Sequence, residues 1–369
     1  MLLRILHVFG QTSRGGAESM IMNYYRKIDR NEIQFDFVKH SELEGDFDEE
    51  IKSLGGRIFS VPRLTVFNYF SYIKTWKEFF SAHPEYRIVH VHHFKLAGAV
   101  LKAAKACGVK VRIAHSHSAF IKGRNHETIL FLTVLSPMMK HCATHLWACG
   151  KEAGKVIFGR KKFTILNNAI DVDKFKFSET ARANIRSEFS IGNDIKVVGH
   201  VGRFVTPKNH PRLIRIFRQL HAEDTKTCLL LVGDGDMRQE IEQLVQKTGL
   251  SDNVIFAGVR TDISAMLSAM DVFLFPSLNE GLPVSIIESE ASGLPCVVSD
   301  NVTKEVNVTD LVTNIPLSAS DKEWIKAVEK AIGRKNQRNR YPQIIKDAHY
   351  DISENAQWLT QEYIRMSKD

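Results

Sequence analysis

The chain has few cysteines, no long apolar run and no recognisable secretory signal. Its five cysteines are odd in number and show no C-x-x-C spacing, which argues against a disulfide framework or a cysteine metal site. We expect them to be buried and reduced, and the protein to be cytoplasmic. No apolar run reaches the roughly 18 to 20 residues that a membrane-spanning helix needs. The first residues, MLLRILHVFG, predict a strand instead of a signal peptide.

Charge is unevenly distributed between the two halves of the chain. Residues 1–166 hold 25 Lys and Arg against 14 Asp and Glu, or +11, whereas residues 167–369 hold 25 against 28, or −3. A basic half suits nucleic acid, anionic lipid or a phosphorylated substrate. The bases are scattered and no helix-turn-helix, zinc or RNA-binding signature is present, so nucleic acid is disfavoured as a partner.

Strands and helices alternate along most of the chain, which is typical of doubly wound parallel sheets in an α/β protein. At 369 residues the chain exceeds what one hydrophobic core usually organises, so two domains are expected. The strands expected are residues 2–9, 35–39, 57–61, 88–92, 110–114, 146–148, 164–166, 195–200, 227–232, 254–256, 272–275 and 296–299.

Residues 276–295, PSLNEGLPVSIIESEASGLP, place two carboxylates beside a strand-to-helix turn. The apolar run before them predicts a buried strand, and Pro283 suits the first position of a helix. Free backbone N–H groups and the helix dipole at such a turn favour phosphate or sugar hydroxyls. Glu280 then lies on the loop and Glu288 on the helix. Two acidic residues at this spacing are by themselves typical of a solvated helix face, so the surrounding motif decides between the two interpretations.

Two other strand-to-helix loops have the composition of a phosphate site. Arg203 and Lys208 follow strand 195–200, where two cations and a helix start can neutralise a diphosphate. Gly15 and Gly16 follow the first strand and either admit a ligand or serve only a tight turn. That loop lacks the G-x-G-x-x-G and G-K-[ST] patterns, which disfavours a nicotinamide dinucleotide and ATP.

Histidines stand at the end of another predicted strand. His115 and His117 follow residues 110–114, and open α/β sheets bind ligands beyond the carboxyl ends of their strands. A histidine at such a place is also often structural. Both residues are candidates for a ligand contact, and their position alone does not choose between them.

The spacing of Glu280 and Glu288 within NEGLPVSIIESEASGLPCVVS resembles the signature of the family 4 retaining glycosyltransferases. GGAE at 15–18, GR-x-x-x-x-K at 202–208 and NNAID at 167–171 extend the resemblance over nearly the whole chain, with alanine at 169 where the family has glycine. The family has the GT-B fold, in which two Rossmann-like domains face a cleft and the last helix returns to the first domain.

The resemblance implies a division of the chain. Residues 1–166 and 352–369 would form an acceptor-side domain, and residues 167–351 a nucleotide-sugar-binding domain. In the returning helix, the side chains expected to be buried on the first domain are Ile352, Trp358, Leu359, Tyr363 and Ile364.

The resemblance also implies roles in binding a nucleotide-diphosphate sugar, with UDP as the expected nucleotide. Glu280 and the N–H groups of Gly281 and Leu282 would orient the sugar, and Glu288 would hold the ribose. Arg203, Lys208 and the helix start at Pro283 would stabilise the charge that grows on the leaving diphosphate.

Further contacts follow from the same resemblance. His115 would reach the sugar from the first domain, and Gly15 and Gly16 would approach the diphosphate or the acceptor. The backbone of residues 258–260 would contact the nucleobase. The side chain of Arg260 would either stack on that base or lie away from it. No cofactor or metal is required, and no Asp-x-Asp motif of metal-dependent transferases is present.

The expected function is retaining transfer of a sugar to an acceptor hydroxyl. Family relatives with a similar first loop often build bacterial extracellular polysaccharides on a lipid carrier. Two alternatives share the fold: a nucleotide-sugar 2-epimerase, against which the Glu280 and Glu288 signature argues, and a non-catalytic nucleotide-sugar binder, in which Arg203, Lys208 or Glu280 would be expected to be lost.

The basic first half suggests a glycan or lipid-linked acceptor at an anionic membrane. Our hypothesis is peripheral docking on the inner face of the plasma membrane through Lys122, Arg124 and Lys140, beside the apolar face of residues 129–139. The alternative interpretation of residues 118–141 is a core helix, which is the commoner use of such a pattern.

Overall fold

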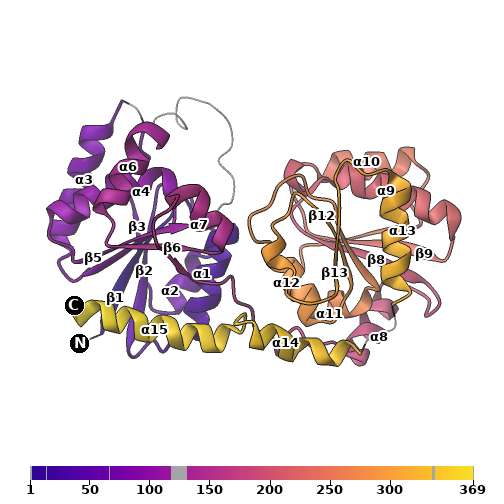
Figure 1. Ribbon diagram of the computed structural model, residues 1–369. Coiled ribbons are helices and arrows are strands. Elements are labelled where there is room, and N and C mark those ends of the chain that lie inside the picture. Colours follow the sequence, from indigo (N-terminus) through magenta and orange to yellow (C-terminus); the bar gives the residue numbers. More distant parts are fainter. Residues whose placement is uncertain (1, 14, 66, 118–130, 335–336, 369) are drawn as a thin grey trace. The chain divides into compact units, whose positions relative to one another are not determined.

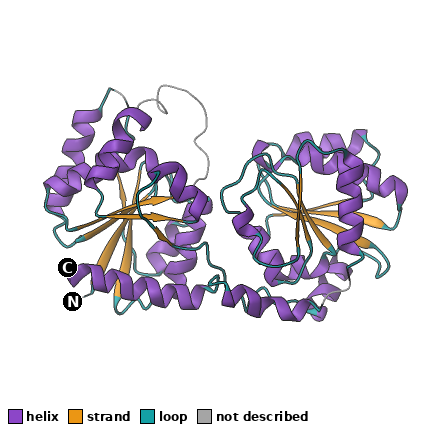
Figure 2. Ribbon diagram, viewed as in Figure 1, coloured by secondary structure: helices purple, strands orange, loops and turns teal. Residues whose placement is uncertain are grey.

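The computed structural model describes residues 2–13, 15–65, 67–117, 131–334 and 337–368, and these form two compact units. Unit 1 comprises residues 1–169 and 352–369, and unit 2 comprises residues 170–351. Each unit has a parallel sheet between layers of helices (Figures 1 and 2). The α/β fold with doubly wound parallel sheets, predicted from the sequence, is confirmed.

Unit 1 has a seven-stranded sheet in the order β3-β2-β1-β4-β5-β6-β7. Its strands are β1 Leu3–Val8, β2 Ile33–Lys39, β3 Ile58–Ser60, β4 Ile88–Val91, β5 Val111–Ser116, β6 His145–Ala148 and β7 Thr164–Ile165. Its helices are α1 Gly16–Lys27, α2 Asp48–Ser53, α3 Tyr69–Ala82, α4 Phe94–Ala106, α6 Ser136–Cys142, α7 Lys151–Phe158 and α15 Ile352–Lys368, and a π-helical turn at Phe131–Leu135 precedes α6.

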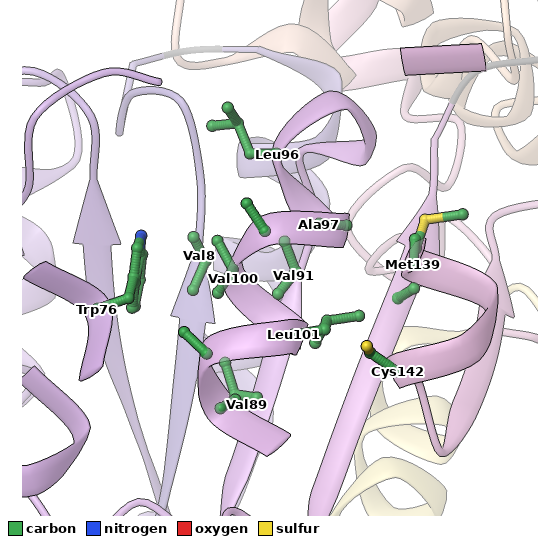
Figure 3. Packing of buried hydrophobic residues seen from close by; sticks show 14 of the residues in the cluster. Val8, Trp76, Val89, Val91, Leu96, Ala97, Val100, Leu101, Met139 and Cys142 are labelled. Atoms are coloured by element: carbon green, nitrogen blue, oxygen red, sulfur yellow. The ribbon is translucent and has the colours of Figure 1, made fainter. Parts of the chain in front are cut away.

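Successive side chains of each strand point to opposite faces of the sheet, so each strand contributes to two cores. Val8, Val89 and Val91 pack under α3, α4 and α6, where the small residues of α4 let that helix lie close to the sheet (Figure 3). Ile5, Ile88 and their neighbours on the other face pack under α1, α2 and α15.

The last helix, α15, therefore completes a layer of the unit formed by the start of the chain. Ile352, Leu359 and Tyr363 are fully buried on unit 1, and Ile364 packs partly buried against the same core. Trp358 is the exception to the prediction, because its side chain is 39% exposed. Its ring lies on the rim of the layer, 5.8 Å from that of Trp147.

The segment expected to be either a core helix or a membrane surface is described only from Phe131 onward. In that part Leu135 and Met139 are buried in the core of unit 1, so the core interpretation holds for them. Lys122, Arg124 and Ile129 lie outside the described residues.

Unit 2 has a six-stranded sheet in the order β10-β9-β8-β11-β12-β13. Its strands are β8 Lys196–Val201, β9 Thr227–Val232, β10 Val254–Gly258, β11 Val272–Phe275, β12 Cys296–Ser299 and β13 Val312–Ile315. Its helices are α8 Glu179–Glu188, α9 His210–Glu223, α10 Arg238–Lys247, α11 Ile263–Ala269, α12 Val284–Ala291, α13 Asp321–Ile332 and α14 Tyr341–Asp347. Helices α9, α10 and α13 share one core with the sheet.

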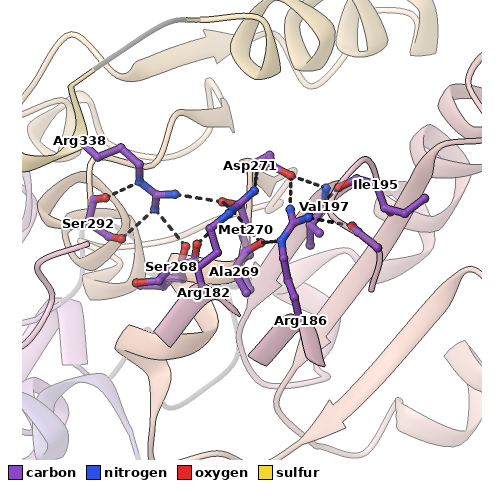
Figure 4. Close-up of polar contacts among 12 residues, drawn as sticks. Arg182, Arg186, Ile195, Val197, Ser268, Ala269, Met270, Asp271, Ser292 and Arg338 are labelled. Atoms are coloured by element: carbon purple, nitrogen blue, oxygen red, sulfur yellow. Dashed lines mark hydrogen bonds and ion pairs between the residues drawn. The ribbon is translucent and has the colours of Figure 1, made fainter. Parts of the chain in front are cut away.

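Three arginines close the carboxyl end of α11 in unit 2 (Figure 4). The last carbonyls of a helix have no partner within it, and here the guanidinium groups of Arg182, Arg186 and Arg338 donate to the carbonyls of residues 267–270. Asp271 accepts from Arg182 and Arg186 at 2.7 Å each, which balances part of this charge. Polar bonding thus fixes the turn into β11.

No described helix is both long and apolar enough to cross a membrane.

Glu290 on α12 is a buried carboxyl group that links stability to pH. It accepts hydrogen bonds from the backbone and hydroxyl of Thr309, and burial raises its pKa from 4.5 to about 8. Between these values the native state holds a proton that the unfolded state has released, so stability falls as pH rises. We expect the melting temperature of Glu290→Gln, relative to wild type, to rise between about pH 5 and pH 8.

Thermal unfolding at several pH values tests this, with the exposed Glu329→Gln on α13 as the control. A melting-temperature difference between Glu290→Gln and wild type that does not change with pH would contradict the assignment.

Candidate active site

The order of strands in unit 2 creates one place where loops diverge. Strands β8 and β11 are neighbours, and the chain winds outward from them in opposite directions. The loops after their carboxyl ends therefore leave to opposite sides and leave room between them, which is where open α/β sheets bind ligands. Arg203 and Lys208 come from the loop after β8, and Glu280 comes from the loop after β11.

Hydrogen bonds join these two loops. The N–H of Leu278 donates to the carbonyl of Pro207 at 2.8 Å, and the side-chain amide of Asn209 donates to the carbonyl of Pro276 at 3.0 Å. Asn209 has the left-handed backbone conformation, φ 57°, which asparagine tolerates better than most residues. The two loops are therefore held in register with one another.

The structure brings Lys208 and Glu280 into direct contact. Nζ of Lys208 lies 2.9 Å from Oε1 of Glu280, and the two side chains are only 16% and 18% exposed. The same ammonium lies 4.6 Å from the ring centre of Phe275. Partial exclusion of water strengthens such charge interactions, so this pair is a preformed polar centre between the loops.

Arg203 lies beside this pair on the same loop. Its side chain is exposed and forms no ion pair with any residue that the structure describes. The backbone of this loop lies close to the loop after β9. A Cβ atom on Gly233, whose φ is 134°, would lie 2.1 Å from the carbonyl oxygen of Gly202. Only glycine fits at that approach, and Arg203 remains available for an anionic ligand.

Helix α12 begins one residue later than expected. Pro283 is its N-cap and Val284 its first residue, so Gly281 and Leu282 form the turn that leads into it. Glu288 is half-buried on this helix, and burial raises its pKa from 4.5 to about 7, against a smaller lowering by Lys174. A carboxyl group with this pKa changes its charge near neutral pH.

Arg260 is held by carboxylates at its predicted position. Its guanidinium donates to Glu188 at 2.7 Å and to Asp262 at 2.8 and 2.7 Å. If Arg260 moved onto a nucleobase it would have to give up these partners, whereas its neighbour Val259 is already 61% exposed.

The ligand contacts that the sequence predicts in unit 1 come from two places, the end of β5 and the start of α1. His115 lies inside β5 and not after it, and its side chain is 1% exposed; His117, the first residue beyond the strand, is half-buried. The strand ends two residues later than predicted, so the earlier histidine lies within the sheet. Gly15 is the N-cap of α1, and a Cβ on Gly16 would meet nothing within 4 Å.

Three residues that support the site were missed by the sequence analysis. Asn209 and Phe275 act as described above, and the buried Ser277 lies with its hydroxyl 3.5 Å from Oε1 of Glu280. The carbonyl of Ser277 in turn accepts from the hydroxyl of Ser299 at 2.5 Å. Only the position of Asn209, between a proline turn and a helix start, could have indicated a structural role.

Proteins with similar sequences are named as glycosyltransferases. A family model described as "Glycosyl transferases group 1" matches residues 181–347. The putative glycosyltransferase EpsF of Bacillus subtilis is 35% identical over 99% of this chain and 98% of its own length. The capsular polysaccharide biosynthesis glycosyltransferase CapH of Staphylococcus aureus is 25% identical over 90% of this chain and 92% of its own.

Solved structures share the fold. HepE of Anabaena, crystallised in complex with UDP, matches with a TM-score of 0.79 at 18% identity, covering 98% of this chain and 99% of that one. WaaG, a glycosyltransferase involved in lipopolysaccharide biosynthesis, matches with a TM-score of 0.71 at 17% identity, covering 97% and 99%. The full-length likeness to EpsF and the matched domain model agree: the chain belongs to the group 1 glycosyl transferases, and its fold is GT-B.

Proposed function

We propose that this glycosyltransferase moves the sugar of a UDP-sugar donor to an acceptor hydroxyl, with retention of anomeric configuration. The reaction would serve the synthesis of a bacterial surface or extracellular polysaccharide. The observation that carries the proposal is the Lys208 and Glu280 pair between the loops after β8 and β11. The names of EpsF and CapH support the pathway class. UDP as the nucleotide is supported by the ligand named for HepE and by an Escherichia coli relative named as a UDP-Gal-dependent galactosyltransferase.

The chemistry required of unit 2 is mainly electrostatic. As the bond between sugar and diphosphate breaks, negative charge grows on the leaving phosphate. Lys208 and Arg203 supply cations to it, and the turn at Gly281 and Leu282 supplies the positive end of α12. Without donor, Lys208 is neutralised by Glu280, so donor binding exchanges one anionic partner of the lysine for another. Glu280 is then available to accept hydrogen bonds from the sugar hydroxyls.

Unit 1 would contribute a histidine and the acceptor surface. His117 is the more accessible of the two candidates, because His115 is covered within the sheet. Gly16, the first residue of α1, leaves open space beside the backbone, which suits the approach of a phosphate or an acceptor, whereas the space at Gly15 is taken by the carboxylate of Glu18.

In the mechanism we propose, the acceptor attacks on the face from which the diphosphate leaves, and the leaving phosphate oxygen takes the acceptor proton. The anomeric configuration of the product, measured by NMR, tests retention. A 2-epimerase would change the donor in the absence of acceptor, so the same measurement on donor alone separates the two activities.

The cation pair gives the first kinetic prediction. Removing one preorganised donor from a developing anion typically costs about 10²- to 10³-fold in rate, so we expect Arg203→Ala and Lys208→Ala each to lose turnover on this scale. Lys226→Ala, in which the replaced lysine is exposed and paired with Asp194, should keep wild-type turnover. Near wild-type kcat in both site variants, with their fold intact by circular dichroism, would refute the phosphate role.

The two carboxylates should differ in their effect on binding of free UDP. Glu288→Gln replaces the carboxylate proposed for the ribose by an uncharged amide with a single acceptor oxygen and should weaken binding. Glu280→Ala should spare binding, because it frees Lys208 for the diphosphate, while lowering turnover. Equal effects of both changes on the dissociation constant of UDP would show that this division is wrong.

Glu288 also predicts a dependence on pH. Its pKa of about 7 means that the carboxylate takes up a proton as pH falls through neutrality and becomes a weaker acceptor for two ribose hydroxyls. Affinity for UDP should therefore fall more steeply in wild type than in Glu288→Gln below about pH 7. The phosphate of UDP titrates equally in both proteins, so parallel pH profiles in calorimetry would contradict the role.

We also propose that unit 1 docks on an anionic membrane, through a surface different from the segment predicted from the sequence. Phe67 and Phe70, before and in the first turn of α3, are 97% and 87% exposed, and Lys74 and Lys77 follow them at helical spacing. Lys102 and Lys105 on the neighbouring α4 are exposed as well. Exposed aromatic rings beside a row of lysines suit the interface of an anionic bilayer.

Vesicle sedimentation tests the docking surface. Wild type should bind vesicles of phosphatidylglycerol and phosphatidylcholine, and binding should fall steeply with salt, because the attraction is screened within roughly 8 to 10 Å at ordinary ionic strength. The double variant Phe67→Ser with Phe70→Ser should bind far less, whereas Leu43→Ser, another exposed apolar residue, should bind as wild type does. Equal binding to neutral and anionic vesicles, or none to either, would favour a soluble acceptor.

A further inference from the structure

Five histidines gather on one face of the sheet in unit 1. His7 lies on β1, His90 lies on β4 and His92 follows it, and His115 and His117 lie in and just after β5. These strands are neighbours, with His7 opposite His90, and all five side chains lie on the face covered by α1 and α15. Four of them are at most 5% exposed, and His117 is half-buried. Such a concentration of buried imidazoles exceeds what a single sugar contact requires.

Neutral imidazole is the form of histidine that binds metals, and burial favours an uncharged ring over a charged one. A neutral imidazole carries one N–H and one lone pair, and the lone pair is what a metal ion coordinates.

Hydrogen bonds can fix the orientation of His115. Its Nδ1 lies 3.0 Å from Nε2 of His90, and Nδ1 of His90 lies 2.6 Å from the hydroxyl oxygen of Tyr363. When the Nδ1–H of His115 donates to His90, the lone pair of His115 is on Nε2. That atom is buried and has no hydrogen-bond partner among the described residues. A histidine ligand usually has this arrangement, with its second nitrogen bonded to an outer partner.

His92 has the same kind of outer partner. Its Nε2 lies 2.9 Å from Nδ1 of His7, and its Nδ1 lies 2.9 Å from Nε2 of His117. When the Nε2–H of His92 donates to His7, the lone pair of Nδ1 faces His117. A metal ion between Nδ1 of His92 and Nε2 of His117 would take the place of the single proton that these two atoms share. That proton would move to Nδ1 of His117.

We propose that His92, His115 and His117 form a binding site for a divalent transition metal such as Zn²⁺, with His7 and His90 as its outer hydrogen-bonding partners. Ring nitrogens of the three ligands lie within 4.8 Å of one another. A tetrahedral zinc with bonds of about 2.0 to 2.1 Å needs nitrogens about 3.3 Å apart, a small widening of the 2.9 Å contact.

The choice of triad and of metal follows from access and ligand type. His7, His90 and His92 also come together but are all buried, whereas His117 is half-buried, so a metal ion would have a route from solvent to the triad that contains it. Imidazole ligands suit zinc, copper and nickel, while Mg²⁺ and Ca²⁺ prefer oxygen. All three proposed ligands belong to unit 1. His117 is also the histidine proposed to contact the sugar, but metal binding is measured without the transfer reaction.

Metal titration of chelator-treated protein tests the proposal. We expect one equivalent of Co²⁺ to bind with the visible spectrum of a tetrahedral nitrogen site, and Zn²⁺ to displace it and raise the melting temperature. His117→Gln and His92→Gln should lose this binding by more than about 100-fold, and His90→Asn, which removes an outer partner, should weaken it about 10- to 100-fold.

The control is His83→Ala, because His83 beside Glu85 is a surface pair of the kind that binds zinc adventitiously. This variant should bind as wild type does. Circular dichroism of the metal-free variants establishes that they are folded; His117→Gln, at the half-buried end, is the change least expected to disturb the core. Absence of one tight equivalent in wild type, or tight binding that survives in folded His117→Gln, would overturn the proposal.

Discussion

The pairing of β8 with β11 is the constraint on which the proposed catalytic centre depends. These strands are neighbours in the sheet of unit 2 although two β-α units separate them in sequence, and the chain winds away from them in both directions. Two loops that carry opposite charges therefore begin side by side. The ion pair between Lys208 and Glu280, and the hydrogen bonds of Asn209 and Leu278, are consequences of that pairing.

Burial acts differently on the charged groups of the two units. In unit 2, partial burial leaves Lys208 and Glu280 paired and raises the pKa of Glu288 to the neutral range, so these groups can exchange partners or protons when a ligand arrives. In unit 1, burial favours neutral rings for His7, His90, His92 and His115, and no carboxylate lies among their hydrogen-bond partners in the described chain. One group is suited to an anionic substrate, and the other to a cation.

Much of the fold could be predicted from the sequence because parallel strands buried on both faces are short apolar runs, and helices between them have amphipathic periodicity. Residues 272–275 and 296–299 were expected to be strands and form β11 and β12 with the same bounds. The sequence-based predictions were wrong at the ends and edges of elements, where the hydrophobic periodicity stops. β5 extends through Ser116, and Trp358 lies at the edge of a layer, because the ends of strands and the rims of helices depend on what packs over them.

The sequence by itself determined the α/β class, the candidate charged residues of unit 2 and the family resemblance, since each depends on local composition and spacing. Only the tertiary structure decided which of these residues meet. It joined Lys208 to Glu280, held Arg260 on Glu188 and Asp262, and covered His115 while leaving His117 half-buried. It also collected five histidines from three strands, because contacts between strands far apart in the chain are set by sheet order, which no local pattern of residues encodes.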